Sequence, residues 1–451
     1  MENNRLTYKN YIVIGSLIFG MLFGAGNLIF PVHLGQLAGA NWWQAALGFL
    51  TSGVLLPVLG LLAISITSSQ GIYDLARPIG HHYALSFMIL IYATIGPFFA
   101  TPRTATVPFT IGFDPYLPKT WRTGGLLLYS ALFFLLVYYL SSKESKITVL
   151  IAKVLNPVFL LMLFVIFLLA FSSPLALAKN APITLEYATN ALSSGLLQGY
   201  NTMDALASLA FGITVITAVK QLGVTEQKEI SLATAKGGSL GILSIGVIYI
   251  ALILLGAQSV STFGLAENGG ITLTQIAHHY LGVFGDALLA TLTTVTCLST
   301  SMGLVIASSQ TFHQRFEKIS YKQMLALNCL LSFTIANLGL DTIISWSLPV
   351  LMFLYPLAIT LILLGITSPL FQKNSLVYQT TTLFTLIPAL FDFVNALPAG
   401  LRQTSFVQSM LRFASRNFPF FELGFGWICF SLLGFFIGII WYLAHSQKRA
   451  Q

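Results

Sequence analysis

The sequence predicts an all-α, polytopic membrane protein. Of its 451 residues, 56% are hydrophobic and only 8% are charged, whereas a soluble globular domain carries roughly 25% charged residues. Apolar runs long enough to cross about 30 Å of hydrocarbon recur from one end of the chain to the other. Most of the protein surface is therefore expected to face lipid.

Twelve membrane-spanning helices are expected, with no linker long enough to separate soluble domains. They are predicted at residues 10–37, 42–68, 83–112, 123–141, 147–172, 189–219, 231–258, 284–313, 322–339, 344–367, 376–396 and 423–445. A short helix outside the bilayer is predicted at 272–281. The first ten spans form two blocks of five, 10–172 and 189–367, with 376–445 following them. Because each block has an odd number of spans, the second block starts on the opposite side of the membrane.

The basic residues are unevenly distributed between the loops on the two sides. Of the 22 Lys and Arg, six fall in one set of loops, Arg103 lies within a span, and the remainder fall in the other set or at the termini. The positive-inside rule therefore places both termini in the cytoplasm of a cell whose plasma membrane holds the protein. The net charge of +8 is explained by orientation and an anionic leaflet, and nucleic acid is not expected as a partner.

The first span is predicted to be interrupted at Gly24, Ala25, Gly26 and Asn27. Each glycine lowers helix propensity by about 1 kcal/mol relative to alanine, and an asparagine can cap a helix that begins after it. Unwound backbone survives at membrane depth only where it is packed in protein or lines a polar cavity. Its amides can face a carboxylate and its carbonyls a cation. The alternative is that the glycines only permit close helix packing.

The sixth span carries a matching interruption. Asn201, Thr202 and Asp204 lie between apolar segments and can end and restart a helix. An ionisable residue at this depth costs at least about 2.5 kcal/mol, so Asp204 is predicted to be functional. Paired interrupted helices in the two halves of a chain point to the midplane binding site of a secondary transporter.

Two further charged residues lie within spans. Arg103 is a candidate to pair with Asp204 or a substrate carboxylate, or to close an outer gate, and the alternative is that it extends to the outer interface. Asp392, near the outer end of the eleventh span, is expected at the interface rather than in a transport role.

The eighth span is rich in hydroxyl side chains, and most are expected to bond back to their own helix. The neighbours Ser299 and Thr300 can instead complete an all-oxygen site for a small hard cation, if they face freed carbonyls of the first span. The three cysteines and the seven histidines show no metal-ligand spacing. The chain has no phosphate-binding loop, so ATP coupling is not expected, and Asp204 lacks a partner for enzymatic acid–base chemistry.

Several segments resemble the bacterial branched-chain amino acid symporters, the BrnQ or LIVCS family. The resemblance rests on residues 23–27 followed by Ile-Phe-Pro, on 96–107, and on 199–206, in this order along nearly the whole chain. It implies a carrier of leucine, isoleucine and valine driven by a sodium or proton gradient. It also implies the leucine-transporter type of fold of the amino acid–polyamine–cation group. That fold has five-plus-five inverted repeats with helices 1 and 6 broken, and two helices would follow here.

The resemblance also implies site residues. The carbonyls of Gly20 and Phe23 and the hydroxyls of Ser299 and Thr300 would hold one Na⁺. The amides of Ala25 and Gly26 would meet the substrate carboxylate, and the carbonyls of Tyr200 to Thr202 its ammonium.

The prediction is therefore Na⁺-coupled symport by alternating access. A proton-coupled carrier that uses Asp204 is the first alternative, and a channel is a weaker one because no filter element recurs. The residues expected at the substrate site are Gly24, Ala25, Gly26, Asn27, Tyr200, Asn201 and Thr202, with Arg103 and Asp204 in gating or coupling.

Overall fold

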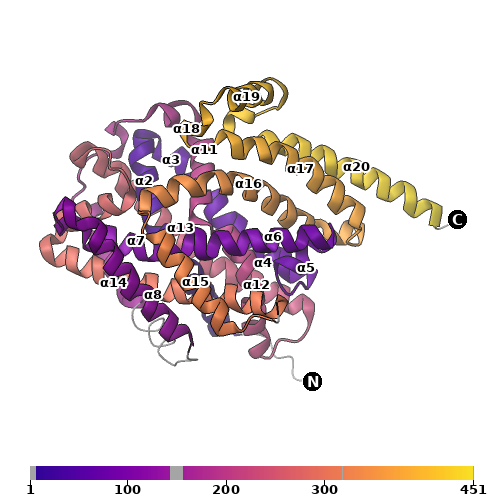
Figure 1. Ribbon diagram of the computed structural model, residues 1–451, viewed down its shortest axis with the longest axis horizontal. Helices are drawn as coiled ribbons and strands as arrows, with labels where there is room; N and C mark the ends of the chain where they lie inside the picture. Colours follow the sequence, from indigo (N-terminus) through magenta and orange to yellow (C-terminus); the bar gives the residue numbers. More distant parts are fainter. Residues whose placement is uncertain (1–6, 143–155, 317, 450–451) are drawn as a thin grey trace.

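The computed structural model describes residues 7–142, 156–316 and 318–449, and within these ranges it is helical with no strands (Figure 1). Eight helices among the described residues are long and apolar enough to cross a membrane, and two shorter apolar helices accompany them. The all-α membrane fold predicted from the sequence is confirmed. The number of crossings, twelve, stays a prediction.

The helices follow one another with short connections. They are α1 (Tyr8–Leu22), α2 (Ala25–Ala38), α3 (Trp42–Leu50), α4 (Leu56–Thr67), α5 (Ile72–Ala76), α6 (His81–Ala93), α7 (Ala100–Gly112), α8 (Arg122–Ser142), α10 (Asn156–Ser172), α11 (Leu185–Gly199), α12 (Asp204–Gln221), α13 (Gln227–Phe263), α14 (Gly269–Arg315), α15 (Tyr321–Ala336), α16 (Leu340–Thr367), α17 (Ser375–Asn395), α18 (Ala399–Arg402), α19 (Ser405–Asn417) and α20 (Gly426–Arg449). Short 3₁₀ or π turns include η3 (Thr94–Phe98), η8 (Tyr200–Thr202) and η10 (Phe421–Leu423).

Each expected span coincides with helical segments of the described chain, although the start of span 147–172 lies outside the described residues. The short helix expected at 272–281 forms the first part of α14. Gly282, with φ of +59°, separates it from the remainder of that helix. This backbone conformation favours glycine, and it turns the chain from the short segment into the next span.

Close backbone contacts fix how the interrupted first span packs. A Cβ added at Gly35 of α2 would lie 2.0 Å from the carbonyl oxygen of Ile253 on α13, and one added at Gly256 of α13 would lie 2.0 Å from that of Val32 on α2. Small residues let helix backbones approach in this way in membranes, where the hydrophobic effect does not drive helices together. The glycines of these two helices therefore set the position of α2.

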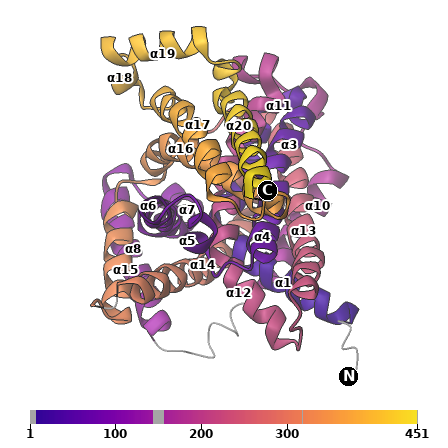
Figure 2. The same ribbon diagram turned by 90° about the vertical axis from the view of Figure 1, so that its right-hand side faces the viewer.

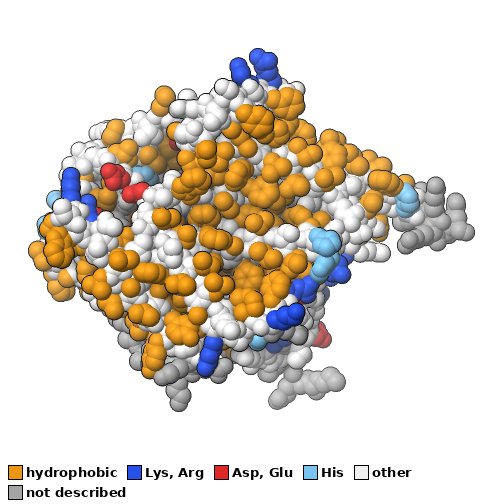
Figure 3. Space-filling view, viewed as in Figure 1, with side chains coloured by type: hydrophobic (Ala, Val, Ile, Leu, Met, Phe, Trp, Pro, Cys, Tyr) orange, Lys and Arg blue, Asp and Glu red, His pale blue; other side chains and the backbone are white. Residues whose placement is uncertain are grey.

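The last two long helices, α17 and α20, pair with each other on one side of the molecule (Figures 1 and 2). In the sequence, α18 and α19 connect α17 to α20, and they lie at one end of the structure (Figure 2). Leu411 and Ala414 on the buried face of α19 pack with Phe391 and Val394 of α17. Hydrophobic side chains are spread across the whole face drawn in Figure 3, and Lys and Arg side chains lie mainly toward its edges, as expected for a protein surrounded by lipid.

Candidate functional site

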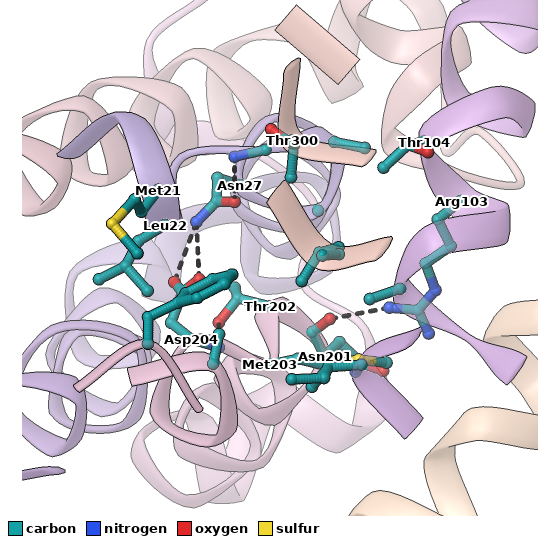
Figure 4. Close-up of a pocket in the computed structure, with 18 residues that line it drawn as sticks. Met21, Leu22, Asn27, Arg103, Thr104, Asn201, Thr202, Met203, Asp204 and Thr300 are labelled. Atoms are coloured by element: carbon teal, nitrogen blue, oxygen red, sulfur yellow. Dashed lines mark hydrogen bonds between the residues drawn. The ribbon is translucent and has the colours of Figure 1, made fainter. Parts of the chain in front are cut away.

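The two predicted interruptions face each other across a small cavity (Figure 4). The segment between α1 and α2 forms one wall, and η8 with the start of α12 forms another. Side chains of α7 and α14 complete the lining, including Arg103 and Thr300. The structure therefore brings together segments that lie in both halves of the chain.

The first span is broken where the sequence predicts it. Helix α1 ends at Leu22, Phe23 and Gly24 are extended, and α2 begins at Ala25. The amide of Gly24 donates a hydrogen bond of 2.7 Å to Oδ1 of Asn27, so Asn27 satisfies one of the amides freed by the break. The glycines do more than permit packing, because the backbone here is unwound beside a cavity.

The two breaks are joined by a buried polar cluster. Nδ2 of Asn27 donates to both carboxylate oxygens of Asp204, at 3.1 and 2.9 Å. The hydroxyl of Tyr249 on α13 donates to Oδ2 of Asp204 at 2.6 Å and also contacts Nδ2 of Asn27. All three side chains are buried. The cost of placing Asp204 at this depth is thus offset by hydrogen bonds from two other helices.

The second break is a short 3₁₀ turn, η8, which leads through Met203 into α12. Met203 is in the left-handed conformation, with φ of +61°. Such a residue costs about 1–3 kcal/mol and persists where the surroundings impose it, which is common at functional sites. The Thr202 hydroxyl donates to the carbonyl of Gly199 at 2.9 Å and accepts from the amide of Asp204 at 3.4 Å.

Arg103 is buried, with 2% of its surface exposed, so the alternative that it extends to the interface is wrong. Its Nη1 donates to the carbonyl of Asn201 at 2.8 Å, its Nη2 contacts the hydroxyl of Ser347, and its guanidinium lies 5.0 Å from the centre of the Phe30 ring. No carboxylate pairs with it among the described residues, Asp204 included. Its Nε has no hydrogen-bond partner there either. A buried cation without a counter-charge thus lines the cavity.

The predicted cation ligands are only partly brought together. The hydroxyl of Thr300 lies 3.3 Å from the carbonyl oxygen of Phe23 and 3.1 Å from that of Thr296. Ser299 and Gly20 are half-buried and do not line the cavity. Of the four expected ligands, Thr300 and Phe23 are therefore in contact. No group of three or more His, Cys, Asp or Glu side chains gathers in the described part of the chain.

Of the three substrate-site residues predicted at the second break, two line the cavity and one does not. Asn201 and Thr202 line the cavity. The Tyr200 side chain does not line it, and its ring is buried in a stack with Tyr355, with ring centres 3.9 Å apart. Only the backbone of Tyr200 remains a candidate for substrate contact.

Two residues depart from sequence-based reasoning in opposite ways. Asp392 was expected at the interface, but its side chain is completely buried, because α16, α19 and α20 pack around α17. Tyr249 was not anticipated at all. A single tyrosine in an apolar span gives no sequence signal, and only the packing of α13 against the first break reveals its role.

None of the histidines lines the cavity. One of them, His278, belongs to a hydrogen-bonded cluster with Tyr116 and Asp286. Nδ1 of His278 and the hydroxyl of Tyr116 each lie 2.6 Å from Oδ2 of Asp286. This hydrogen bond to Asp286 raises the pKa of the Tyr116 hydroxyl. The cluster links the loop after α7 to α14 across the turn at Gly282 and adds no ligand to the central site.

The structure shares its fold with solved proteins that differ from it widely in sequence. One is the nucleobase-cation-symport-1 family transporter Mhp1 in a closed conformation with bromovinylhydantoin bound, with a TM-score of 0.61 and 12% identity, covering 96% of this chain and 93% of that one. Another is MhsT in complex with L-phenylalanine, with a TM-score of 0.54 and 16% identity, covering 95% and 98%. These similarities confirm the leucine-transporter type of fold. The fold, its broken helices and the apolar helices long enough to cross a membrane define the class as a polytopic membrane protein of this type.

The sequence comparisons identify the family. A family profile described as "Branched-chain amino acid transport protein" matches residues 7–445. The chain is 45% identical to the branched-chain amino acid permease BrnQ of Lactobacillus delbrueckii subsp. lactis, over 94% of this chain and 95% of that protein. It is 37% identical to BrnQ of Bacillus subtilis over 97% and 98%. The chain belongs to the branched-chain amino acid transport protein family, as the sequence resemblance implied.

Proposed function

We propose that this protein imports branched-chain amino acids together with Na⁺ across the plasma membrane by alternating access, with both termini in the cytoplasm. The observation that carries the proposal is the junction of the two broken helices. Asn27 from one break and Asp204 from the other are hydrogen-bonded beside a cavity. A single pair of broken helices around one cavity is the arrangement of a carrier rather than of a channel filter.

The cavity offers complementary groups to a zwitterionic amino acid. Arg103 and the amides at the start of α2, from Ala25 and Gly26, supply positive charge and dipole for a carboxylate. The carbonyls of η8 supply acceptors for an ammonium group. Arg103 supports the assignment, because its buried guanidinium has no carboxylate partner among the described residues, so the carboxylate of the substrate can provide the counter-charge.

The remaining lining suits an aliphatic side chain. Ile95, Phe211 and Leu304, from three different helical segments, line the cavity with apolar groups. Relatives of this chain carry the name branched-chain amino acid permease. Since one methylene is worth about 1–3 kcal/mol in such a pocket, leucine, isoleucine and valine are expected to compete with one another.

The proposed sodium site lies where the first break contacts Thr300 of α14, whereas Asp204 is on α12. Thr300 contributes a hydroxyl and Phe23 a carbonyl already in contact. Gly20 and Ser299 would complete the ligand set if α1 and α14 closed around the ion. Bound Na⁺ would stabilise the same unwound segment whose amides hold the substrate, so each ligand would favour binding of the other.

Proton coupling through Asp204 is the second candidate, because Asp204 is a buried carboxyl group at the junction. Its oxygens accept hydrogen bonds from Asn27 and Tyr249. The Asn27 amide donates to both oxygens, which suits the ionised form, whereas the Tyr249 hydroxyl can donate to a carboxylate or accept from a protonated one. A response of leucine uptake to an H⁺ gradient would distinguish a proton carrier from a residue that only joins the two breaks.

Solute counterflow with purified protein in liposomes tests the transport proposal. Liposomes loaded with unlabelled leucine should accumulate labelled leucine transiently, and isoleucine and valine should compete while arginine and glycine should not. A flux without counterflow would identify a channel and contradict the proposal. Counterflow of a different amino acid class would contradict the assigned substrate.

A further inference from the structure

Asp392 is the one aspartate among the described residues that is both fully buried and without a hydrogen-bond partner on either carboxylate oxygen. It lies on α17, in the helical pair that follows the two blocks of five spans. Pro388 lies one turn before it in the same helix. The other two buried aspartates, Asp204 and Asp286, both accept hydrogen bonds from tyrosine hydroxyls. Asp392 is therefore in a different chemical situation from either.

Among the residues whose side chains the structure describes, no cation compensates the charge of Asp392. The helices packed against α17 are α16, α19 and α20, and the turn η8 also approaches, because Tyr200 is in electrostatic range of Asp392. The titratable and charged residues on these elements and on α17 itself, as far as their side chains are described, are Asp341, Tyr355, Tyr200, Arg412, Arg416, Tyr378, Tyr442, Cys429 and His445. None of them forms an ion pair or hydrogen bond with Asp392. The two arginines are exposed.

We propose that Asp392 is a proton-binding site whose carboxyl group is protonated in this conformation. An ionised carboxylate cannot remain in a buried position with neither a counter-charge nor a donor, and such a group neutralises by taking up a proton. A metal cation is a poorer occupant, because Asp392 belongs to no group of three or more acidic, His or Cys side chains in the described ranges. The step is the addition of one proton from solvent to one carboxylate oxygen.

The position of Asp392 connects this proton to the central site. Tyr200 is buried, its hydroxyl has no hydrogen-bond partner, and its backbone begins the turn that lines the cavity. Loss of the proton would place a negative charge within electrostatic range of this hydroxyl, which is a buried donor without a partner among the described residues, as are the Tyr355 hydroxyl and the Trp427 indole. Tyr200 would then be drawn from its stacking contact with Tyr355, and η8 would move with it. Proton release from Asp392 is thus expected to weaken substrate binding, an extension that rests on the proposed function.

Infrared spectroscopy of the protein in lipid vesicles tests the protonation directly. A protonated carboxyl group gives a carbonyl-stretch band that an ionised one lacks. The wild type at neutral pH should show this band, Asp392→Asn should lose it, and the double variant Asp204→Asn/Asp286→Asn should retain it. The double variant keeps the test decisive even if Asp392→Asn does not fold. A band that is absent from the wild type, or that persists in Asp392→Asn, would overturn the proposal.

Leucine binding at neutral and alkaline pH tests the connection to the cavity. Asparagine mimics the protonated form, so Asp392→Asn should bind leucine within about twofold of the wild type at neutral pH and lose the decline at alkaline pH that the wild type shows. A decline that persists in the variant would refute the connection. If neither the wild type nor the variant binds leucine, the proposed function is contradicted. The protonation of Asp392 is then still decided by the infrared band, which does not depend on transport.

Discussion

The contact between Gly24 and Thr300 predicts a substitution that damages the site and a second one that repairs it. A Cβ added at Gly24 would lie 2.8 Å from the Thr300 Cγ2 methyl and 3.3 Å from its hydroxyl. The backbone of Gly24, with φ of −138° and ψ of −162°, is open to any residue. The effect of Gly24→Ala is therefore steric, and it displaces the hydroxyl that contacts the Phe23 carbonyl. Overpacking of this kind costs about 1–3 kcal/mol, which would weaken coupled binding by about 5- to 150-fold.

Thr300→Ser removes the Cγ2 methyl and keeps the hydroxyl, so it should restore activity in the Gly24→Ala background. The assay is leucine uptake into proteoliposomes at a series of Na⁺ concentrations for the two single variants and the double variant, read as a double-mutant cycle. Gly303→Ala, on the same helix as Thr300, is the matched control because nothing lies within 4 Å of its added Cβ. Wild-type uptake in Gly24→Ala, or a double variant no better than Gly24→Ala, would refute the reasoning.

Three further outcomes are expected. Tyr249→Phe removes the donor 2.6 Å from Asp204 and should lower the free energy of unfolding by about 1–3 kcal/mol; an unchanged melting temperature of the purified protein would show that this hydrogen bond is not needed. Arg103→Lys should weaken leucine binding at least about tenfold while the protein stays folded, because an ammonium group cannot reproduce the planar fork of a guanidinium; full affinity in equilibrium binding would remove Arg103 from the substrate site. Gly256→Ala should sharply lower the yield of folded protein, since its Cβ would lie 2.0 Å from the Val32 carbonyl oxygen and helices cannot adjust by that much without separating; normal thermal stability would contradict the packing described for α2 and α13.

The helix breaks could be predicted because their causes are local. Glycines and a capping asparagine at residues 24–27, and polar residues at 201–204, weaken a helix wherever they occur. The same holds for the all-α membrane fold, which follows from the length and composition of the apolar runs.

The partners across the site could not be predicted, because they depend on how helices pack. Asn27 and Asp204 were each identified as candidates, but their hydrogen bond joins residues 177 positions apart. Arg103 was a candidate partner of Asp204 and instead binds the Asn201 carbonyl. Close backbone contacts between helices, such as that of Gly35 with Ile253, determine which side chains meet. The only trace of such a contact in the sequence is a glycine, and glycines are common in membrane helices.

Burial of polar groups was the other limit of sequence reasoning. Asp392 lies near the end of a span, where an interfacial position is the simplest expectation, yet the packing of three helices around α17 buries it. Tyr249 is one tyrosine in a long apolar helix, and its position 2.6 Å from Asp204 is set by the register of α13 against α2. The depth of a side chain along a span can be predicted, whereas the direction in which it points cannot.

The central claim is that a sodium gradient drives leucine through this cavity, and gradient-driven uptake tests it most directly. Proteoliposomes containing wild type, Thr300→Ala or Thr300→Ser should be given an inward Na⁺ gradient or an inward H⁺ gradient, each without the other. The wild type and Thr300→Ser both keep a hydroxyl at the position that contacts the Phe23 carbonyl. Both should therefore concentrate leucine with the Na⁺ gradient and not with the H⁺ gradient. Thr300→Ala should lose most of that response, by about tenfold if one ion ligand is worth about 1.4 kcal/mol. Uptake that follows the H⁺ gradient and ignores Na⁺ would contradict the sodium site and favour proton coupling.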